Sequence, residues 1–169
     1  MEINIKIRQE SISSTDAIAL LNELACELEH ITGSSGNASF DVADVSDSRA
    51  RFVVARDSSG SAVGCGAIRP MEDNVAEIKR VYARAKHAGI GAAILRYLEQ
   101  EAAAIGFRTL RLETRAINRG AVDFYLRSHY RIIPNFGKYI GHTEAICFEK
   151  TLISSDKTEN SNAYETKSC

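Results

Sequence analysis

The sequence predicts an α/β fold with a mixed, mostly antiparallel central sheet and helices on both of its faces. Three observations predict this fold class. Strand-like segments follow one another without an intervening helix over residues 51–83. The hydrophobic pattern then changes to a period of 3.6 residues, and it returns to alternation at residue 108. A strand meander followed by a right-handed strand–helix–strand unit gives a sheet with both antiparallel and parallel neighbours.

The first part of the chain predicts a strand, a helix and a loop. Residues 3–7 alternate apolar and polar side chains, and residues 14–16 (Ser-Thr-Asp) can cap the helix that follows. The expected apolar stripe of this helix consists of Ile18, Leu21, Leu24, Ala25, Leu28 and Ile31. Residues 32–47 are small, polar and contain glycine, so we expect a loop that can hold a short helix and act as a mobile lid.

The later segments predict the meander and the alternating elements. Residues 51–56 and 62–70 form a hairpin, and residues 75–83 form a third strand. A helix follows and ends at Gly106. Its expected apolar face consists of Gly91, Ile94, Leu95, Leu98, Ala102 and Ile105. After it we expect a strand at 108–114, a helix at 118–128, and two closing strands at 130–133 and 144–150.

Composition indicates one globular domain. The chain has 169 residues, of which 44% are hydrophobic and 25% are charged. We place the domain at residues 1–153 and a disordered polar tail at residues 154–169, where there is almost nothing to bury. The net charge of -1 gives no support for a nucleic-acid-binding protein. No apolar run approaches the roughly 18 residues of a membrane span, and the charged N-terminus does not resemble a signal peptide, so we expect a cytoplasmic protein.

The cysteines and histidines do not predict a metal site. The four cysteines are scattered and form no Cys-x-x-Cys pair: Cys26, Cys65, Cys147 and Cys169. His30, His129 and His142 have no metal-ligand spacing. We therefore expect reduced thiols and no metal.

Two glycines open the second helix, within the stretch KHAGIGAAI at residues 86–94. Glycine costs a helix about 1 kcal/mol relative to alanine, so its use here indicates a need for bare backbone. A helix N-terminus presents unpaired N–H groups and the positive end of the helix dipole, and glycine lets a bulky anion come close to them. The stretch predicts a phosphate or pyrophosphate site, with Arg84 and Lys86 adding positive charge. The alternative is that the glycines only permit a tight turn.

Two common nucleotide-binding motifs match this stretch poorly. A P-loop requires G-x-x-x-x-G-K-[ST], which is absent. A dinucleotide-binding fingerprint requires G-x-G-x-x-G, and Ile94 occupies the third glycine position. The strand before the helix also follows a hairpin instead of opening a parallel unit.

Residues 76–131 resemble the GNAT superfamily of N-acetyltransferases. The family signature Q/R-x-x-G-x-G/A is similar to residues 86–91 (Lys-His-Ala-Gly-Ile-Gly), and the second signature is matched by Asn118, Ala121 and Tyr125. The element order agrees over residues 3–150, and the final Cys-Phe-Glu-Lys resembles a bacterial subgroup. Lys86 departs from the usual Arg or Gln, which keeps the charge but loses the planar fork of arginine. A glycine common in the family is replaced by His87, and the usual proline before the loop is missing.

The resemblance implies a splayed pair of parallel strands, 76–83 and 108–114, with acetyl-CoA between them. It implies that the pantetheine arm pairs with the end of the first strand, that the pyrophosphate binds the loop amides, and that Asn118 contacts the cofactor. The implied cofactor-binding residues are Val81, Tyr82, Ala83, Lys86, His87, Ala88, Gly89, Ile90, Gly91, Ala92 and Asn118.

The resemblance also implies catalytic roles. Attack of an amine on a thioester needs a base, a donor for the oxyanion and an acid for the leaving thiolate. Tyr125 is the implied acid and Glu77 the first candidate base, with Glu113 second. A core aromatic and an exposed strand carboxylate are the respective alternatives for Tyr125 and Glu77. The expected acceptor-binding residues are Glu29, Arg80, Glu113 and Tyr139, and Arg80 with Arg69 would favour a carboxylate on the acceptor.

The expected activity is transfer of an acetyl group from acetyl-CoA to a primary amine of a small molecule, amino acid or peptide, by direct attack in a ternary complex. The alternative is a non-catalytic acyl-CoA-binding regulatory module of the same fold. We expect no metal, no nucleic acid and no membrane among the partners. A homodimer is common in the resembled family and is compatible with this sequence.

Overall fold

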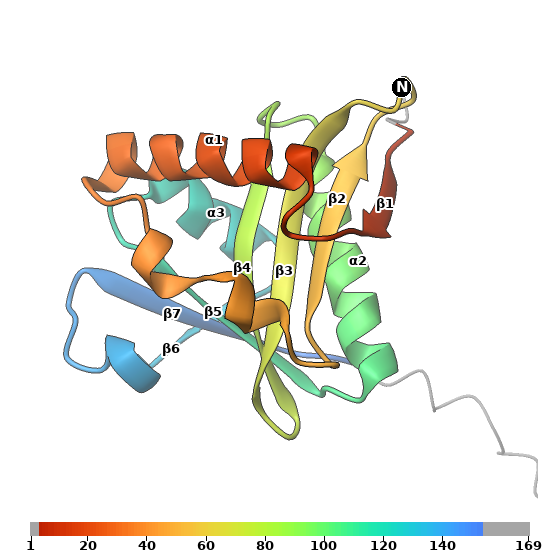
Figure 1. Ribbon diagram of the computed structural model, residues 1–169. Helices are drawn as coiled ribbons and strands as arrows, with labels where there is room; N and C mark the ends of the chain where they lie inside the picture. Colours follow the sequence, from red (N-terminus) through yellow and green to blue (C-terminus); the bar gives the residue numbers. More distant parts are fainter. Residues whose placement is uncertain (1–3, 154–169) are drawn as a thin grey trace, which may run out of the picture.

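The computed structural model describes residues 4–153, which form one seven-stranded sheet with helices on both faces (Figure 1). The strands are β1 (Lys6–Gln9), β2 (Arg51–Arg56), β3 (Ala62–Glu72), β4 (Val75–Ala83), β5 (Thr109–Arg115), β6 (Arg131–Ile133) and β7 (Ala145–Thr151). The α-helices are α1 (Thr15–Thr32), α2 (Ile90–Ile105) and α3 (Arg119–Arg127). Three short 3-10 helices are η1 (Asn37–Ser39), η2 (Val42–Val45) and η3 (Gly137–Tyr139).

The strand order is β1-β2-β3-β4-β5-β7-β6, and every neighbouring pair is antiparallel except β4 and β5. This arrangement confirms the predicted fold class. Strands β2 and β4 have the predicted bounds, and Ser14 caps α1 by accepting from the N–H of Ala17. Strand β1 lies later than predicted, because it pairs with β2 from Lys6↔Arg56 to Gln9↔Val53. The predicted disordered tail lies outside the described residues.

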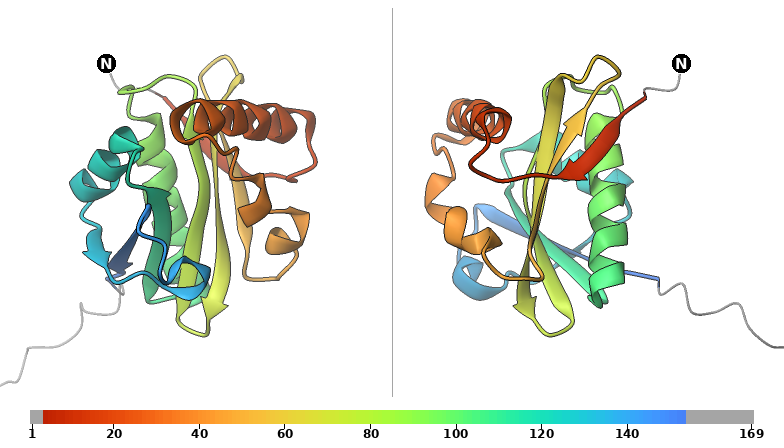
Figure 2. Two further views of the ribbon diagram at one scale, coloured as in Figure 1. Left: turned by 90° about the vertical axis from the view of Figure 1, so that its left-hand side faces the viewer. Right: turned by 45° about the vertical axis from the view of Figure 1, so that its right-hand side comes forward.

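The sheet lies between α1 and α2 (Figure 2). It separates the two larger of the three hydrophobic clusters among the described residues; the third is small and consists of Tyr139, Ala145 and Cys147. Along β2, Val53 and Ala55 pack in the core of α2, whereas Phe52 and Val54 pack in the core of α1. This alternation follows from the two-residue side-chain period of a strand. The sequence of a central strand that is buried on both faces is therefore continuously apolar.

The predicted apolar stripe of α1 was wrong at Ile18, which is 48% exposed. Ala17 and Leu20 pack against the sheet in its place, because a small residue lets the helix approach the strands closely. Farther along the helix, Leu28 and Ile31 line a pocket. The apolar side of α1 thus packs on the sheet near the N-terminal end of the helix and lines a cavity near its C-terminal end. Among residues 4–153, no helix is long and apolar enough to cross a membrane.

Helix α2 packs very closely on β3 because Gly64 and Gly66 face it. A Cβ atom at Gly64 would lie 2.6 Å from the carbonyl oxygen of Tyr82 and 2.8 Å from Cδ1 of Ile94. The first contact is with backbone, which cannot move away cheaply. The glycine therefore fixes the distance between α2 and the sheet, and with it the position of the helix N-terminus.

We expect Gly64→Ala to lower the free energy of unfolding by about 3 kcal/mol, since it forces overpacking between β3, β4 and α2. The matched control is Gly120→Ala in α3, where a Cβ atom would meet nothing within 4 Å. That change should be neutral or should stabilise by up to about 1 kcal/mol. Urea denaturation of both variants measures the difference, and equal midpoints would contradict this packing argument.

Candidate active site

Strands β4 and β5 pair only at one end and then part (Figure 1). The parallel pairing joins Val75–Glu77 to Thr109–Arg111 and does not continue beyond it. From Ile78 onward β4 has a free edge that faces the free edge of β5, although each strand stays paired on its outer side. Backbone N–H and C=O groups along such edges need partners from elsewhere.

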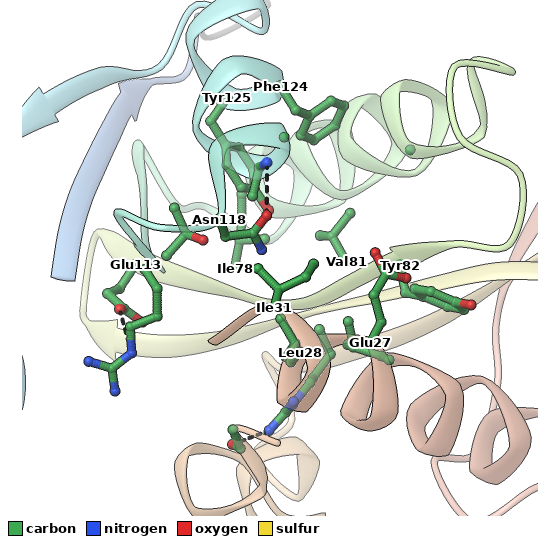
Figure 3. A pocket seen from close by; sticks show the side chains of 18 of the residues that line it. Glu27, Leu28, Ile31, Ile78, Val81, Tyr82, Glu113, Asn118, Phe124 and Tyr125 are labelled. Atoms are coloured by element: carbon green, nitrogen blue, oxygen red, sulfur yellow. Dashed lines mark hydrogen bonds and ion pairs between the residues drawn. The ribbon is translucent and has the colours of Figure 1, made fainter. Parts of the chain in front are cut away.

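A cavity of about 1060 Å³ opens where the strands part (Figure 3). Its walls come from α1, the loop after α1 with η1, β4, β5, the N-terminal end of α2, the length of α3, and η3. Leu28 and Ile31 of α1 form an apolar side, and Glu113 of β5 lies at the other (Figure 3). This volume is at the upper end of the range for small-molecule sites, so it can hold a large ligand.

A β-bulge interrupts β4 at the point where it leaves β5. The register with β3 shifts between Cys65 and Ala67, and Arg80 opposite them has a φ of 58°, in the left-handed region. The thiol of Cys65 donates to the carbonyl oxygen of Arg80 at 3.4 Å. A bulge re-aims the backbone, and left-handed conformations of non-glycine residues are uncommon and cluster at functional sites.

The side chain of Arg80 anchors the loop that follows α1. Its guanidinium donates to the carbonyl oxygens of Ser35, at 3.3 Å, and Gly36, and it lies over the ring of Phe40 at 5.8 Å. Gly36 has a φ of 70°, and a Cβ atom there would lie 3.3 Å from Nη1 of Arg80. The loop predicted as a lid is thus tied to the bulge, with two 3-10 helices inside it.

The N-terminus of α2 has no side-chain cap. Gly89 occupies the N-cap position with a φ of 79°, and the first intrahelical hydrogen bond runs from the N–H of Ala93 to its carbonyl oxygen at 3.0 Å. The N–H groups of residues 90–92 therefore have no partner within the helix. Because residues 89–92 line the cavity, this end of it suits an anion.

Lys86 lies at the same end of the cavity, but its charge is already paired. Its Nζ atom is 2.8 Å from Oε1 of Glu27 and 5.3 Å from the centre of the Tyr82 ring. The lysine therefore bridges the α2 loop to α1. An incoming anion would share Lys86 with this carboxylate.

Helix α3 contributes an amide and a phenol. Asn118 caps α3, with its Oδ1 accepting from the N–H of Ala121 at 3.3 Å, and both residues line the cavity. Tyr125 is 8% exposed and packs edge-on against Phe124, with ring centres 5.0 Å apart. Burial raises the pKa of Tyr125, so its hydroxyl is protonated at neutral pH.

The two candidate bases have different surroundings. Glu113 lines the cavity, its buried Oε1 has no hydrogen-bond partner, and Arg115 lies 3.9 Å from that oxygen. Burial raises the pKa of Glu113. Glu77 is 3% exposed and does not line the cavity; its Oε2 lies 2.7 Å from Nη2 of Arg69. Glu113 is therefore the carboxylate that a ligand in the cavity can reach.

Behind Glu77, charged side chains tie the loop to the sheet. Arg69 pairs with Asp44 of η2 as well as with Glu77, and Oε1 of Glu77 lies 3.6 Å from Nζ of Lys79. Lys79 in turn donates to the hydroxyl of Tyr139 at 3.2 Å. Burial lowers the pKa of Lys79 and raises that of Tyr139. These contacts connect the loop, β3, β4 and η3 through one buried polar cluster.

Most of the site residues predicted from the sequence line one cavity. They are Arg80, Val81, Tyr82, Ala83, Lys86, His87, Gly89, Ile90, Gly91, Ala92, Glu113, Asn118, Tyr125 and Tyr139. Glu29 is exposed on α1, and neither it nor Ala88 or Glu77 belongs to the lining. In residues 4–153 no group of three or more His, Cys, Asp or Glu side chains could hold a metal ion.

Sequence reasoning missed several lining residues, including Lys79, Lys138 and Glu27. Lys79 had a detectable signal, because Glu77 and Lys79 are charged residues two apart on a strand that is otherwise apolar there. Such a spacing puts both on one face of the sheet and predicts a paired charge. Glu27 and Lys138 had no signal in the sequence that distinguishes them from solvated charges.

Comparisons of this chain with protein families, with curated proteins and with solved structures all return acetyltransferases or acyltransferases. Residues 18–130 match the acetyltransferase (GNAT) family. An IAA acetyltransferase of Azospirillum brasilense is 31% identical over 152 residues, which cover 88% of this chain and 99% of that protein. A solved Klebsiella pneumoniae protein assigned as an acyl-CoA N-acyltransferase has a TM-score of 0.75 at 27% identity and covers 89% of this chain and 99% of its own. A GNAT family acetyltransferase of Elizabethkingia anophelis, solved with acetyl-CoA bound, has a TM-score of 0.67 at 17% identity, over 89% of this chain and 100% of that one.

Proposed function

Because the chain belongs to the GNAT acetyltransferase family, we propose that it transfers the acetyl group of acetyl-CoA to a primary amine by direct attack in a ternary complex. The observation that carries this proposal is the cavity between the parted strands β4 and β5. It runs from the uncapped N-terminus of α2 to Glu113, whose buried Oε1 has no hydrogen-bond partner among the described residues. The family resemblance predicted from the sequence is confirmed. Membership of the subgroup that ends in Cys-Phe-Glu-Lys stays a prediction.

In the proposal the cofactor lies along β4 with its pyrophosphate at α2. The amide groups of the pantetheine arm pair with the free edge at Val81–Ala83, and the phosphates accept from the N–H groups of residues 90–92. The Nδ2 group of Asn118 donates to the cofactor, since only the Oδ1 atom is used in capping. The bound acetyl-CoA in the Elizabethkingia anophelis protein supports this choice of ligand.

The proposed reaction forms a C–N bond and breaks a C–S bond. The neutral acceptor amine attacks the thioester carbonyl carbon, and Glu113 takes the proton that the nitrogen loses as the C–N bond forms. The oxyanion accepts from backbone N–H at the bulge around Arg80, where the register of β4 changes. The C–S bond then breaks, and Tyr125 gives its proton to the leaving thiolate. Solvent protons restore the tyrosine, and Glu113 releases the proton it took.

Release of free thiol from acetyl-CoA, measured with a broad panel of primary amines, tests the proposal. We expect Tyr125→Phe to lower kcat by about 100-fold or more, because a positioned proton donor contributes on that order, while acetyl-CoA affinity is kept. Tyr97→Phe is the matched control, since Tyr97 is a half-buried tyrosine of α2 outside the cavity. Tight acetyl-CoA binding without turnover of any amine would favour the non-catalytic binding module.

The pH profile of kcat/KM tests the base. Glu113 must lose its proton to act, and burial raises its pKa, so activity should rise with pH through a value above the ordinary glutamate pKa of about 4.3. Glu113→Gln should remove this acid limb and lower kcat by about 100-fold. The comparison variant Glu77→Gln should keep the limb, because Glu77 does not line the cavity. A limb that survives Glu113→Gln and disappears in Glu77→Gln would assign the base to Glu77.

A further inference from the structure

The acceptor end of the cavity contains the parts of an anion site, centred on Tyr139. We propose that the acceptor amine also carries an anionic group, such as a carboxylate, and that Tyr139, Lys79 and Lys138 bind it. This inference rests on the proposed acetyl transfer, because it names the acceptor class for the same cavity.

The hydroxyl of Tyr139 has a proton to donate. Its oxygen accepts from Nζ of Lys79 at 3.2 Å, and no hydrogen bond within residues 4–153 uses its own O–H. Tyr139 is 7% exposed, and both it and Lys79 line the cavity. A buried hydroxyl beside an ammonium group is a pair of donors, and an anion would accept from both.

A second ammonium group lies next to the same ring. Nζ of Lys138 is 5.5 Å from the centre of the Tyr139 ring, and Nζ of Lys79 is 5.9 Å from it. Lys138 forms no ion pair among the described residues, although it lines the cavity from an exposed position. The tyrosine ring therefore lies near one buried and one exposed positive charge.

The charge balance around this point leaves it positive. Arg69 pairs with Asp44 and Glu77, and Lys79 lies 3.6 Å from the same Glu77. Arg115 pairs with Glu144 at 2.8 Å and with Glu113 at 3.9 Å. Five cations (Arg69, Lys79, Arg80, Arg115 and Lys138) therefore outnumber four carboxylates (Asp44, Glu77, Glu113 and Glu144) by one. Arg80 lines the cavity with only backbone carbonyls as partners within the part of the chain that the structure describes. A polyamine or another multiply cationic acceptor would be repelled here, whereas an anionic group would be attracted.

This arrangement changes the carboxylate site expected from the sequence. Arg69 and Arg80 were expected to provide it, but Arg69 is occupied by Asp44 and Glu77, and Arg80 by the loop carbonyls. The remaining donors are Lys138 and Tyr139 of η3, together with Lys79, which also lies 3.6 Å from Glu77. Arg80 adds charge at a distance and does not need to contact the anion.

Glu113 completes the acceptor site. Its unpartnered Oε1 is a place for the amine, and its charge acts on both Lys79 and Tyr139, so the two subsites are neighbours. Leu28 and Ile31 point into the same cavity from α1 (Figure 3). A compact acceptor with an amine, a nearby anionic group and an apolar side chain would match all three surfaces. An apolar α-amino acid has this chemistry.

The test compares acceptors that differ only in the anionic group. The probes are the twenty L-amino acids, their carboxamides and the corresponding decarboxylated amines, with O-phosphoethanolamine and ethanolamine as a phosphate pair. We expect kcat/KM for the favoured acid to exceed that for its amide by at least about tenfold, because the acid carries an anion that several partly buried cations attract. A preference within the phosphate pair alone would assign the site to phosphorylated amines and would still support an anion site.

Variants show whether the preference comes from these side chains. Lys138→Gln should reduce the ratio of kcat/KM for the acid to kcat/KM for its amide about fivefold, because one exposed charge is lost. Tyr139→Phe should reduce this ratio by more than Lys138→Gln does. Lys6→Gln, on the exposed edge strand β1, is the control and should leave the ratio unchanged. Because the ratio is measured within one variant, partial unfolding does not alter it.

Three outcomes overturn the inference, and they can be told apart. Amides and decarboxylated amines acetylated as fast as the acids would remove the anion site but leave acetyl transfer standing. A preference for acids that Lys138→Gln and Tyr139→Phe both retain would show that these two side chains do not form the anion site, and acetyl transfer would still stand. Acetyl-CoA binding with no acetylation of any probe would remove the proposed function itself, and the acceptor class with it.

Discussion

The parting of β4 and β5 is the constraint on which the rest of the structure depends. Each strand is held on its outer side, β4 by β3 and β5 by seven residue pairs with β7, so both are fixed while the edges between them stay open. The pairing at Val75–Glu77 closes one end of the gap. Helix α2 connects these two strands, so its N-terminus comes to lie at the open end. A gap inside a continuous sheet thus brings free strand edges and free helix N–H groups to one cavity.

Several charged side chains are buried around this gap, beside the cavity, and their burial lowers the stability of the fold. Glu77, Lys79 and Glu113 lie in or next to it, and ionised side chains in such places are expensive unless they are paired. The two buried side-chain oxygens without a hydrogen-bond partner among the described residues belong to Glu77 and Glu113. Glu77 is compensated by Arg69 and Lys79, whereas Glu113 faces the cavity. One carboxylate therefore organises the loop, and the other remains available to a ligand.

The sequence predicts the elements well where one local pattern decides them. Strands β2 and β4 have the expected bounds because β2 is a mostly apolar segment with turn residues on both sides, and β4 begins directly after the turn at Asp73-Asn74. The glycines at residues 89–91 locate the helix N-terminus because a bare backbone at a helix start has few other uses. The exposed position of Ile18 was missed, since periodicity alone does not reveal that Ala17 faces the sheet.

The site is less predictable because its side chains are positioned by partners far away in the chain. Glu77 could equally be a base or an exposed carboxylate from its sequence, and only its contact with Arg69, which also binds Asp44, shows a buried tie. The spacing of Glu77 and Lys79 predicts a paired charge, but it does not show that Lys79 is buried, because lysines are rarely buried. Its position depends on Tyr139, sixty residues later in the chain. Long-range pairs of this kind need the folded arrangement.

Amide hydrogen exchange, measured with and without acetyl-CoA, shows whether the parted strands hold the cofactor. If the cofactor pairs with the free edge of β4 and the open end of α2, exchange should slow at residues 81–83 and 90–92, and the edge strand β1 should not change. Protection confined to other segments, or no protection at saturating acetyl-CoA, would contradict the account.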